Sequence, residues 1–344
     1  MISKPVLAGL SLGELKELLN HYPAFRTRQI HEWICRGAGT FSEMTNLPLS
    51  TREELTEKYA VLSGELCPEQ KDRDGTVKLG IKLEDASVIE TVMLRDGKDR
   101  KTACLSSQAG CPIGCVFCKT GTLGFSRNLT AGEIVSQFLH LKKTDGEISN
   151  IVIMGMGEPL LNLDELRRAL NFFMDSGGLN ISKRRITLST SGITKGILEL
   201  AKDGPDIRLA FSLNSAREDL RDRLMPVNKG NPLAQVKEAL VEYQEKWERR
   251  ITLEMVLFAG LNTDADEAKA AADFARGLNA VFNLIPWNQV PGMEFEGRPL
   301  RRPREQEIAT FAAALESHGL KVTRRIEKGR NISGACGQLG VVSG

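Results

Sequence analysis

The feature that most constrains the fold is an alternation of short apolar runs with longer amphipathic segments between residues 102 and 320. Runs of about four to eight apolar residues are typical of buried strands, and the segments between them have the helical period. The expected strands are 102–107, 150–155, 184–190, 207–213, 250–258 and 280–287, with helices from Thr130 and near 163–176, 194–202, 232–247, 264–277 and 303–317. Strands that alternate with helices form a parallel sheet with right-handed connections. The sequence therefore predicts an α/β fold that curls into a partial or full barrel.

Two other segments precede this alternation. Residues 1–60 space leucine and isoleucine as on helix faces, which predicts a small helical N-terminal domain. Residues 73–95 alternate in polarity and contain the turn pair Asp74-Gly75, which predicts a β hairpin. We therefore divide the chain into a helical domain (1–60), a β hairpin link (61–101) and a barrel (102–344).

Three cysteines follow the first strand of the predicted barrel. Cys111, Cys115 and Cys118 are spaced Cys-x-x-x-Cys-x-x-Cys. In such barrels the C-terminal ends of the strands carry the site. A [4Fe–4S] cluster normally takes four thiolates, so three would leave one iron open to a substrate or cofactor. A zinc site is the alternative, but structural zinc has four ligands and the nearest further cysteine, Cys104, lies seven residues away.

Polar residues also follow other strands of the predicted barrel. The second strand closes on GMGEP, which contains Gly157 and Glu158. The later strands end on Ser189, on Ser212 and Asn214, and on Asn288. Each position alone is consistent with a simple turn. Because these strand ends share one edge of the sheet, together they predict the rim of a pocket for a polar ligand.

These motifs together resemble the RlmN/Cfr family of radical S-adenosylmethionine (SAM) RNA methyltransferases. The similar segments are SSQAGCPIGCVFCKTGTLGFSRNLTAGEI (106–134), MGMGEPLLN (154–162), ITLSTSGI (186–193) and ACGQL (335–339), and shorter ones extend the resemblance over nearly the whole chain. The resemblance implies an incomplete (β/α)6 radical SAM barrel. It also implies two cofactors, a [4Fe–4S] cluster and SAM.

The resemblance implies roles for individual residues. Cys111, Cys115 and Cys118 would bind the cluster, and Gly157, Glu158, Ser189, Ser212, Leu213, Asn214 and Asn288 would bind SAM. Cys336 would carry the methyl group, Cys104 would release the product by forming a disulfide with it, and Glu90 would accept a proton. A cysteine carrier suits this chemistry because adenine C2 and C8 are electrophilic, whereas a thiolate is a good nucleophile for the methyl group of SAM.

The expected activity is methylation of an adenosine at C2 in 23S rRNA, with tRNA as a further candidate substrate. The alternatives are methylation at C8, methylation of another RNA position, a radical SAM enzyme that does not methylate, and a zinc-dependent RNA-binding module. Three residues depart from the family pattern. Asn214 stands where the family usually has histidine, Asn331 replaces an aspartate, and Gly334 replaces an alanine.

Composition adds expectations about partners. The net charge is only +2, but basic residues gather at 183–185, 298–304 and 324–330. Such runs fit either contact with RNA phosphates or a solvated face. The N-terminal helices and these runs are the candidate RNA contacts. With no secretory signal and no long apolar stretch, we expect a cytoplasmic monomer without a membrane segment, reduced by a donor such as flavodoxin or ferredoxin.

Overall fold

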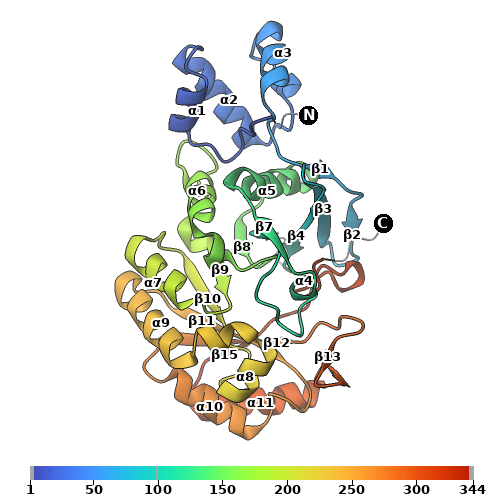
Figure 1. Cartoon of the computed structure of the whole chain (residues 1–344), viewed down its shortest axis with the longest axis vertical. Helices are drawn as coiled ribbons and strands as arrows, with labels where there is room; N and C mark the ends of the chain where they lie inside the picture. Colours follow the sequence, from blue (N-terminus) through green and yellow to red (C-terminus); the bar gives the residue numbers. More distant parts are fainter. Residues whose placement is uncertain (1–3, 98–99, 341–344) are drawn as a thin grey trace.

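The computed structural model describes residues 4–97 and 100–340, and one large sheet runs through it (Figure 1). The sheet has 11 strands in the order β1-β3-β4-β5-β8-β9-β10-β11-β12-β15, with β2 paired to β3. The strands are β1 Glu65–Leu66, β2 Gln70–Lys71, β3 Val77–Lys82, β4 Val88–Arg95, β5 Lys101–Leu105, β8 Asn150–Ile153, β9 Ile186–Thr190, β10 Arg208–Ser212, β11 Ile251–Leu257, β12 Ala280–Pro286 and β15 Val322–Arg324.

The parallel part of the sheet, from β5 to β15, is the barrel. Its strands pair in parallel throughout, and the strand order does not close on itself within the described residues. The helices that connect the strands are α5 Ala131–Asp145, α6 Leu163–Met174, α7 Thr194–Asp203, α8 Glu218–Leu224, α9 Leu233–Trp247, α10 Ala265–Ala275 and α11 Glu305–Ser317. The predicted incomplete barrel is confirmed. β15 is a seventh parallel strand, which was not predicted.

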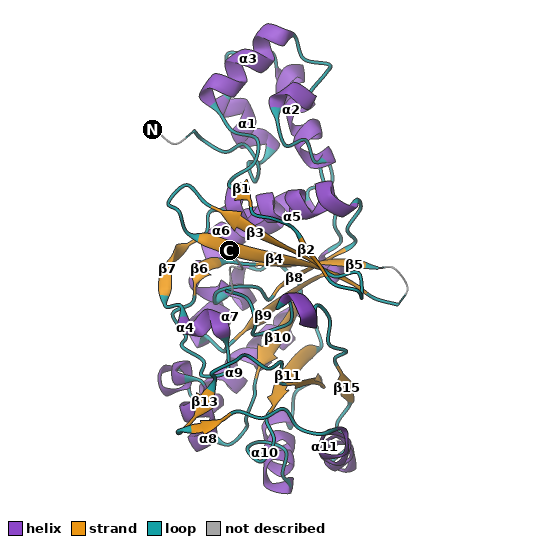
Figure 2. Ribbon diagram, turned by 90° about the vertical axis from the view of Figure 1, so that its right-hand side faces the viewer, coloured by secondary structure: helices purple, strands orange, loops and turns teal. Residues whose placement is uncertain are grey.

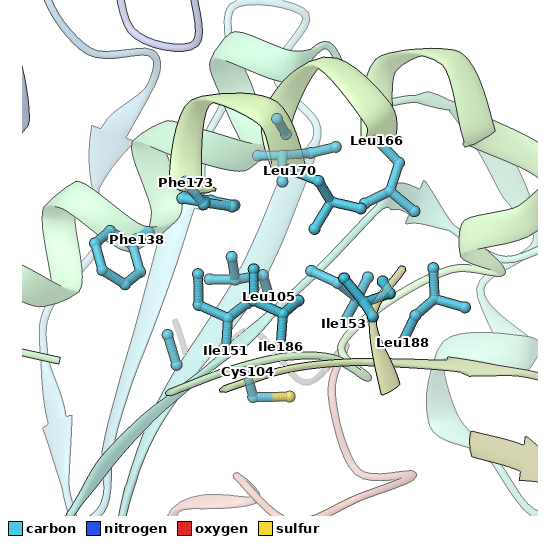
Figure 3. Close-up of a cluster of buried hydrophobic side chains, with 14 of the residues drawn as sticks. Cys104, Leu105, Phe138, Ile151, Ile153, Leu166, Leu170, Phe173, Ile186 and Leu188 are labelled. Carbon is cyan, nitrogen blue, oxygen red and sulfur yellow. The ribbon is translucent and has the colours of Figure 1, made fainter. Parts of the chain in front are cut away.

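The barrel core explains how the strand pattern places the site. Leu105, Ile151 and Ile186 point to one face of the sheet, where they pack against side chains of α5 and α6 such as Phe138 (Figure 3). Successive side chains of a strand point to opposite faces. Cys104, next to Leu105, therefore points to the other face, as Figure 3 shows. That face is the inside of the barrel.

Three helices form the N-terminal part: α1 Leu12–Leu18, α2 Ala24–Arg36 and α3 Leu49–Lys58. They stand at one end of the molecule, above α5 and α6 (Figures 1 and 2). Two ion pairs join the N-terminal part to these barrel helices, one of them from the 3₁₀ turn Phe41–Glu43 between α2 and α3. Glu43 lies 2.9 Å from the Lys143 ammonium group, and Glu14 lies 2.9 Å from the Arg168 guanidinium group.

The segment that the sequence presents as a hairpin link is part of the main sheet. β3 and β4 form the expected antiparallel hairpin, and β4 also pairs antiparallel with β5. The turn predicted at Asp74-Gly75 is present, between antiparallel strands, and a second turn follows it. Asp74-Gly75 joins β2 to β3, whereas the β3–β4 turn contains Asp85 and Ala86, the latter at φ +66°. Both are tight aspartate turns, so local polarity could not distinguish them.

None of the helices in the described part of the chain combines the length and apolarity that a bilayer crossing requires.

Candidate active site

The cysteine loop is held by a small ladder that was not predicted. β6 Gln108–Gly110 pairs antiparallel with β7 Phe125–Asn128, and the Cys111 N–H donates to the Gly124 carbonyl at 2.8 Å. Gly110 has φ +76°, and a Cβ atom there would lie 2.0 Å from the Gly124 oxygen. Only glycine therefore fits at the base of the loop. The ladder holds the loop at the C-terminal end of β5.

The three thiols face one cavity and fit the expected cluster. Cys111, Cys115 and Cys118 all line this cavity, here called the cofactor cavity. Burial raises the pKa of the Cys111 thiol to about 12 and also raises those of Cys115 and Cys118, so a bound cation is needed to hold them as thiolates. Within residues 4–97 and 100–340, no three potential metal ligands gather around a single ion position. A [4Fe–4S] cluster binds each thiolate to a different iron, so it does not require the three sulfurs to surround one ion position.

Strand ends form the rest of the cofactor cavity. Of the residues expected to bind SAM, six line it: Gly157, Glu158, Ser189, Ser212, Asn214 and Asn288. The seventh, Leu213, is fully buried in the core beside them and does not line the cavity. Gly157 has φ +101°, and a Cβ atom there would lie 2.5 Å from the Gln108 side chain, so the backbone turn needs glycine.

Glu158 is the most fully bonded acid of this cavity. One carboxylate oxygen accepts from the Thr190 hydroxyl at 2.8 Å and from the Leu160 N–H at 3.1 Å. The other accepts from the Ser191 N–H and hydroxyl, both at 2.7 Å. A carboxylate has about four acceptor sites, and four donors occupy them here. Burial raises the pKa of Glu158, while these hydrogen bonds act in the opposite direction. A SAM amino group would therefore have to share or displace one of these donors.

A second acid, Glu254 on β11, was not predicted as a site residue. Its carboxylate accepts from the Ser189 hydroxyl at 2.8 Å, and Ser189 lies 3.3 Å from the Ser212 hydroxyl. Asn214 supports the same wall, since its side-chain oxygen accepts from the Val256 N–H at 2.9 Å. The chain of polar side chains therefore crosses β9, β10 and β11.

Cys336 lies where the cofactor cavity meets a second cavity. The second cavity, here called the cysteine cavity, contains Cys104, and Met154, Ile285, Asn288, Arg325 and Cys336 border both cavities. The Asn288 amide donates to the Cys336 carbonyl at 3.0 Å. Burial raises the pKa of the Cys104 thiol to about 12. All seven cysteines are free thiols, so the structure does not support the predicted disulfide.

Glu90 lies apart from both cavities. It sits on β4 and forms a buried ion pair with Lys78, at 2.9 Å between carboxylate and ammonium. Its other oxygen accepts from the Gly340 N–H. Both carboxylate oxygens of Glu90 therefore have partners within the chain. Its expected role as proton acceptor stays a prediction.

Arg325, which belongs to one of the expected basic runs, lies at the site. Its guanidinium group lies in the wall shared by the two cavities, 3.8 Å from the Glu254 carboxylate and 3.7 Å from the Met154 sulfur. Its neighbours in the expected basic face are paired as well: Arg324 with Glu305, and Arg302 with Glu327 at 3.1 Å. A run of basic residues in the sequence does not show to which face of a strand each side chain points.

Arg221 on α8 is a second arginine without a sequence signal. It is 1% exposed and donates to the Ser191 carbonyl at 2.6 Å and to the Ser212 carbonyl at 2.8 Å. Its guanidinium group also lies over the Phe211 ring, 4.9 Å from the centroid. Arg221 therefore fixes the ends of β9 and β10, where the polar rim begins.

Proteins that are similar to this chain agree with the site described above. The model of the radical SAM superfamily matches residues 105–274. A probable dual-specificity RNA methyltransferase RlmN of Treponema denticola is 48% identical over 337 residues, which cover 98% of this chain and 96% of that protein. Its counterpart in Geobacillus thermodenitrificans is 41% identical over 346 residues, with 98% and 93% covered. A solved radical SAM methyltransferase from Sphaerobacter thermophilus is 37% identical and superposes with a TM-score of 0.92, covering 97% of this chain and 99% of that one.

The radical SAM superfamily uses a [4Fe–4S] cluster and SAM, and the three thiols with the open polar wall beside them fit both. The zinc-module alternative is thereby excluded. The chain belongs to the RlmN/Cfr family and is a radical SAM methyltransferase.

Proposed function

We propose that the protein methylates C2 of an adenosine in RNA, through a methyl group carried on Cys336. The proposed substrates are 23S rRNA and tRNA, in keeping with the dual-specificity RNA methyltransferases to which the chain is similar. One observation supports the proposal above all. Cys336 borders both the cofactor cavity and the cysteine cavity, so its sulfur can face SAM on one side and a base on the other.

The residues of the chain divide the proposed reaction between them. When bound, the cluster and SAM supply the methyl group, the electron and the radical chemistry. Cys336 accepts the methyl group as a thiolate and holds its carbon beside C2 of the adenine. Glu90 accepts the proton that leaves C2. Attack of the Cys104 thiolate on the Cys336 sulfur breaks the bond between that sulfur and the product carbon, which keeps the electron pair and takes up a proton from solvent to become the methyl group. The disulfide that forms is reduced to two thiols by the external reductant before the next turnover.

The N-terminal helices (1–60) are the proposed RNA-contacting domain. At the start of α2, Phe25 is 58% exposed, and the Arg26 guanidinium group lies 5.1 Å from its ring centroid. Leu49, at the start of α3, is 62% exposed. An exposed aromatic ring beside a cation is suited to stacking on an unpaired base while neutralising phosphate. By contrast, the pairing of Arg302 and Arg324 with acids weakens the case for the C-terminal basic run.

The proposed function is tested by mass spectrometry of nucleosides from rRNA and tRNA after anaerobic reaction with SAM and a reductant such as flavodoxin or ferredoxin. We expect 2-methyladenosine in both RNAs. A product with 8-methyladenosine would move the specificity to C8, and another methylated nucleoside would move it to another position. SAM cleavage without any methylated nucleoside would indicate a radical SAM enzyme with a different reaction. Gel filtration and cell fractionation would test the proposals of a monomer and of a cytoplasmic location.

A further inference from the structure

The segment that carries Cys336 follows the last strand of the barrel and has little regular structure. Between residues 329 and 340, here called the methyl-cysteine segment, only Arg330–Ile332 form a short 3₁₀ turn. A segment without a sheet ladder takes its path from individual contacts. In Figure 1 it passes beside β2 and α4 Lys119–Thr122, as its last residues reach the cysteine loop.

Two carboxylates hold the start of this segment. The Asn331 N–H donates to one oxygen of Asp72 at 3.0 Å, and the Asn331 amide donates to the other oxygen at 2.8 Å. The Gly329 N–H donates to Asp74 at 3.0 Å. The side-chain hydrogen bond from Asn331 lowers the pKa of Asp72, so the acceptor is a carboxylate at neutral pH. The segment therefore enters the site along a surface made of two acids.

The turn that presents these acids is itself held in place. Asp72 donates its N–H to the Thr76 carbonyl at 2.8 Å, and the Thr76 N–H donates to the Asp74 carboxylate at 2.9 Å. Gly329 packs so closely that a Cβ atom there would lie 2.8 Å from the Thr76 methyl group. The β2–β3 turn thus provides a fixed surface, and Gly329 fits directly against it.

The far side of Cys336 is held by the barrel and the cysteine loop. The Lys119 N–H donates to the Gly337 carbonyl at 2.8 Å, and the Thr120 hydroxyl donates to the Leu339 carbonyl at 2.8 Å. Cys336 therefore lies between two attachments, and the attachment to the β2–β3 turn contains the side-chain pair Asp72–Asn331. Asn331 lines neither cavity. Asn331 therefore contributes to the attachment of the segment and does not border the space where a base would lie.

We propose that Asp72 and Asn331 are positioning residues that set where the methyl-cysteine segment places Cys336 between the two cavities. The inference rests on the proposed function of Cys336 as the methyl carrier. The pair works only with one acceptor and one donor. Two carboxylates at this distance repel each other, whereas exchanging the two residues restores a side-chain hydrogen bond between an amide and a carboxylate.

The test exchanges the two residues in the full chain with its cluster reconstituted. The variants are Asn331→Asp, Asp72→Asn and the double variant, with Asp85→Asn as the matched control. Asp85→Asn is the same acid-to-amide change, placed in the β3–β4 turn. Asp85 pairs with Arg127 and does not touch the methyl-cysteine segment. The readout is methyladenosine formed per 5′-deoxyadenosine released, together with the methylation of Cys336 by protein mass spectrometry.

We expect Asn331→Asp to lower this ratio about tenfold, since it replaces a charge-assisted hydrogen bond with a repulsion. The double variant should return to within about twofold of the wild type, because donor and acceptor have only changed places. A merely structural role would lower stability without uncoupling SAM cleavage from methylation. An unchanged ratio in Asn331→Asp, or a double variant no better than it, would overturn the proposal.

Two further measurements keep the outcomes apart. If Asn331→Asp does not fold, Asn331→Ala removes the donor without adding a charge, and an unchanged ratio in that variant counts against the pair. A wild-type protein that cleaves SAM but makes no methyladenosine would contradict the proposed function itself. An active wild type with an insensitive Asp72–Asn331 pair would contradict the positioning role alone.

Discussion

The cofactor cavity and the cysteine cavity are neighbours, but they are built in different ways. The cofactor cavity is lined by a loop and by the ends of hydrogen-bonded strands, with Glu158 bonded by four donors and Arg221 holding two strand ends. The cysteine cavity has strand residues such as Cys104 on one side, and it is closed by residues 325–328, 334–336 and 339, which follow the last barrel strand. The proposed cofactor site is thus part of the sheet, whereas the proposed methyl transfer depends on a segment that follows it. The two functions should therefore be separable by mutation.

The largest expected effect comes from the cofactor cavity. Cys118→Ala should remove the cluster, because the cysteine loop supplies three thiolates and the loss of one leaves two. Both SAM cleavage and RNA methylation should fall to background, as measured by iron content, visible absorbance and 5′-deoxyadenosine formation. Cys67→Ala is the control, since Cys67 packs beside Gly80 and lines neither cavity. A Cys118→Ala protein that kept its iron and its SAM cleavage would show that the cluster is held elsewhere.

The second-largest expected effect distinguishes the role of Cys336 from that of the cluster ligands. Cys336→Ala should lower RNA methylation by at least about 10³-fold, because a nucleophile that forms a covalent bond has no substitute. The cluster and SAM cleavage should remain, as measured by 5′-deoxyadenosine released in the absence of methyladenosine. Methylation that persisted in this variant would contradict the methyl-carrier role, with Cys67→Ala again as the matched control.

Substitution of Arg325 tests whether the wall shared by the two cavities matters for methylation. Arg325→Met should lower methylation about tenfold, since a part-buried ion pair with Glu254 is broken and each tenfold change corresponds to about 1.4 kcal/mol. Arg325→Lys keeps the charge and should recover part of the loss. The measurement is kcat and KM for SAM and for RNA separately. A change confined to KM for RNA would mean that Arg325 contacts the substrate and does not join the cavities.

The smallest expected effect concerns stability. Asn214 has φ +56° and accepts from the Val256 N–H, so Asn214→Ala loses a residue that tolerates this conformation together with a hydrogen bond. We expect the free energy of unfolding to fall by about 2 kcal/mol, measured by urea denaturation. Asn214→Asp keeps the acceptor and should cost less. Equal losses in the two variants would show that the side-chain oxygen is not what stabilises the wall.

Much of the fold could be predicted because the sequence patterns of its longer strands and helices are local. Each of the six expected strands overlaps a parallel strand, and α6, α7, α9, α10 and α11 begin within about two residues of their predicted positions. The elements that were missed depend on distant partners. β6 and β7 pair across the whole cysteine loop, and β15 has only three residues and lies beside β12. Short strands of this kind carry too little periodicity to be recognised before their partner is known.

The candidate site was predictable where a motif ends a strand. The cysteine triad, Glu158 and Asn288 were placed on the cavity wall by that rule alone. Glu254 and Arg325 were missed because each lies within or beside a strand and reaches the cavity only through side-chain direction. Their pairing joins β11 to the end of β15, and no sequence pattern connects these two positions.

The position of Cys336 after every barrel strand has a consequence for how the protein is made. During synthesis the cysteine loop and the strands up to β12 leave the ribosome before the methyl-cysteine segment, and chains fold from the N-terminal side first. Apart from Arg325, Cys336 and Gly337, the residues that line the cofactor cavity are then already present. The growing chain thus offers its cluster ligands in a site still open on one side, and the last part of the barrel to be translated closes that opening.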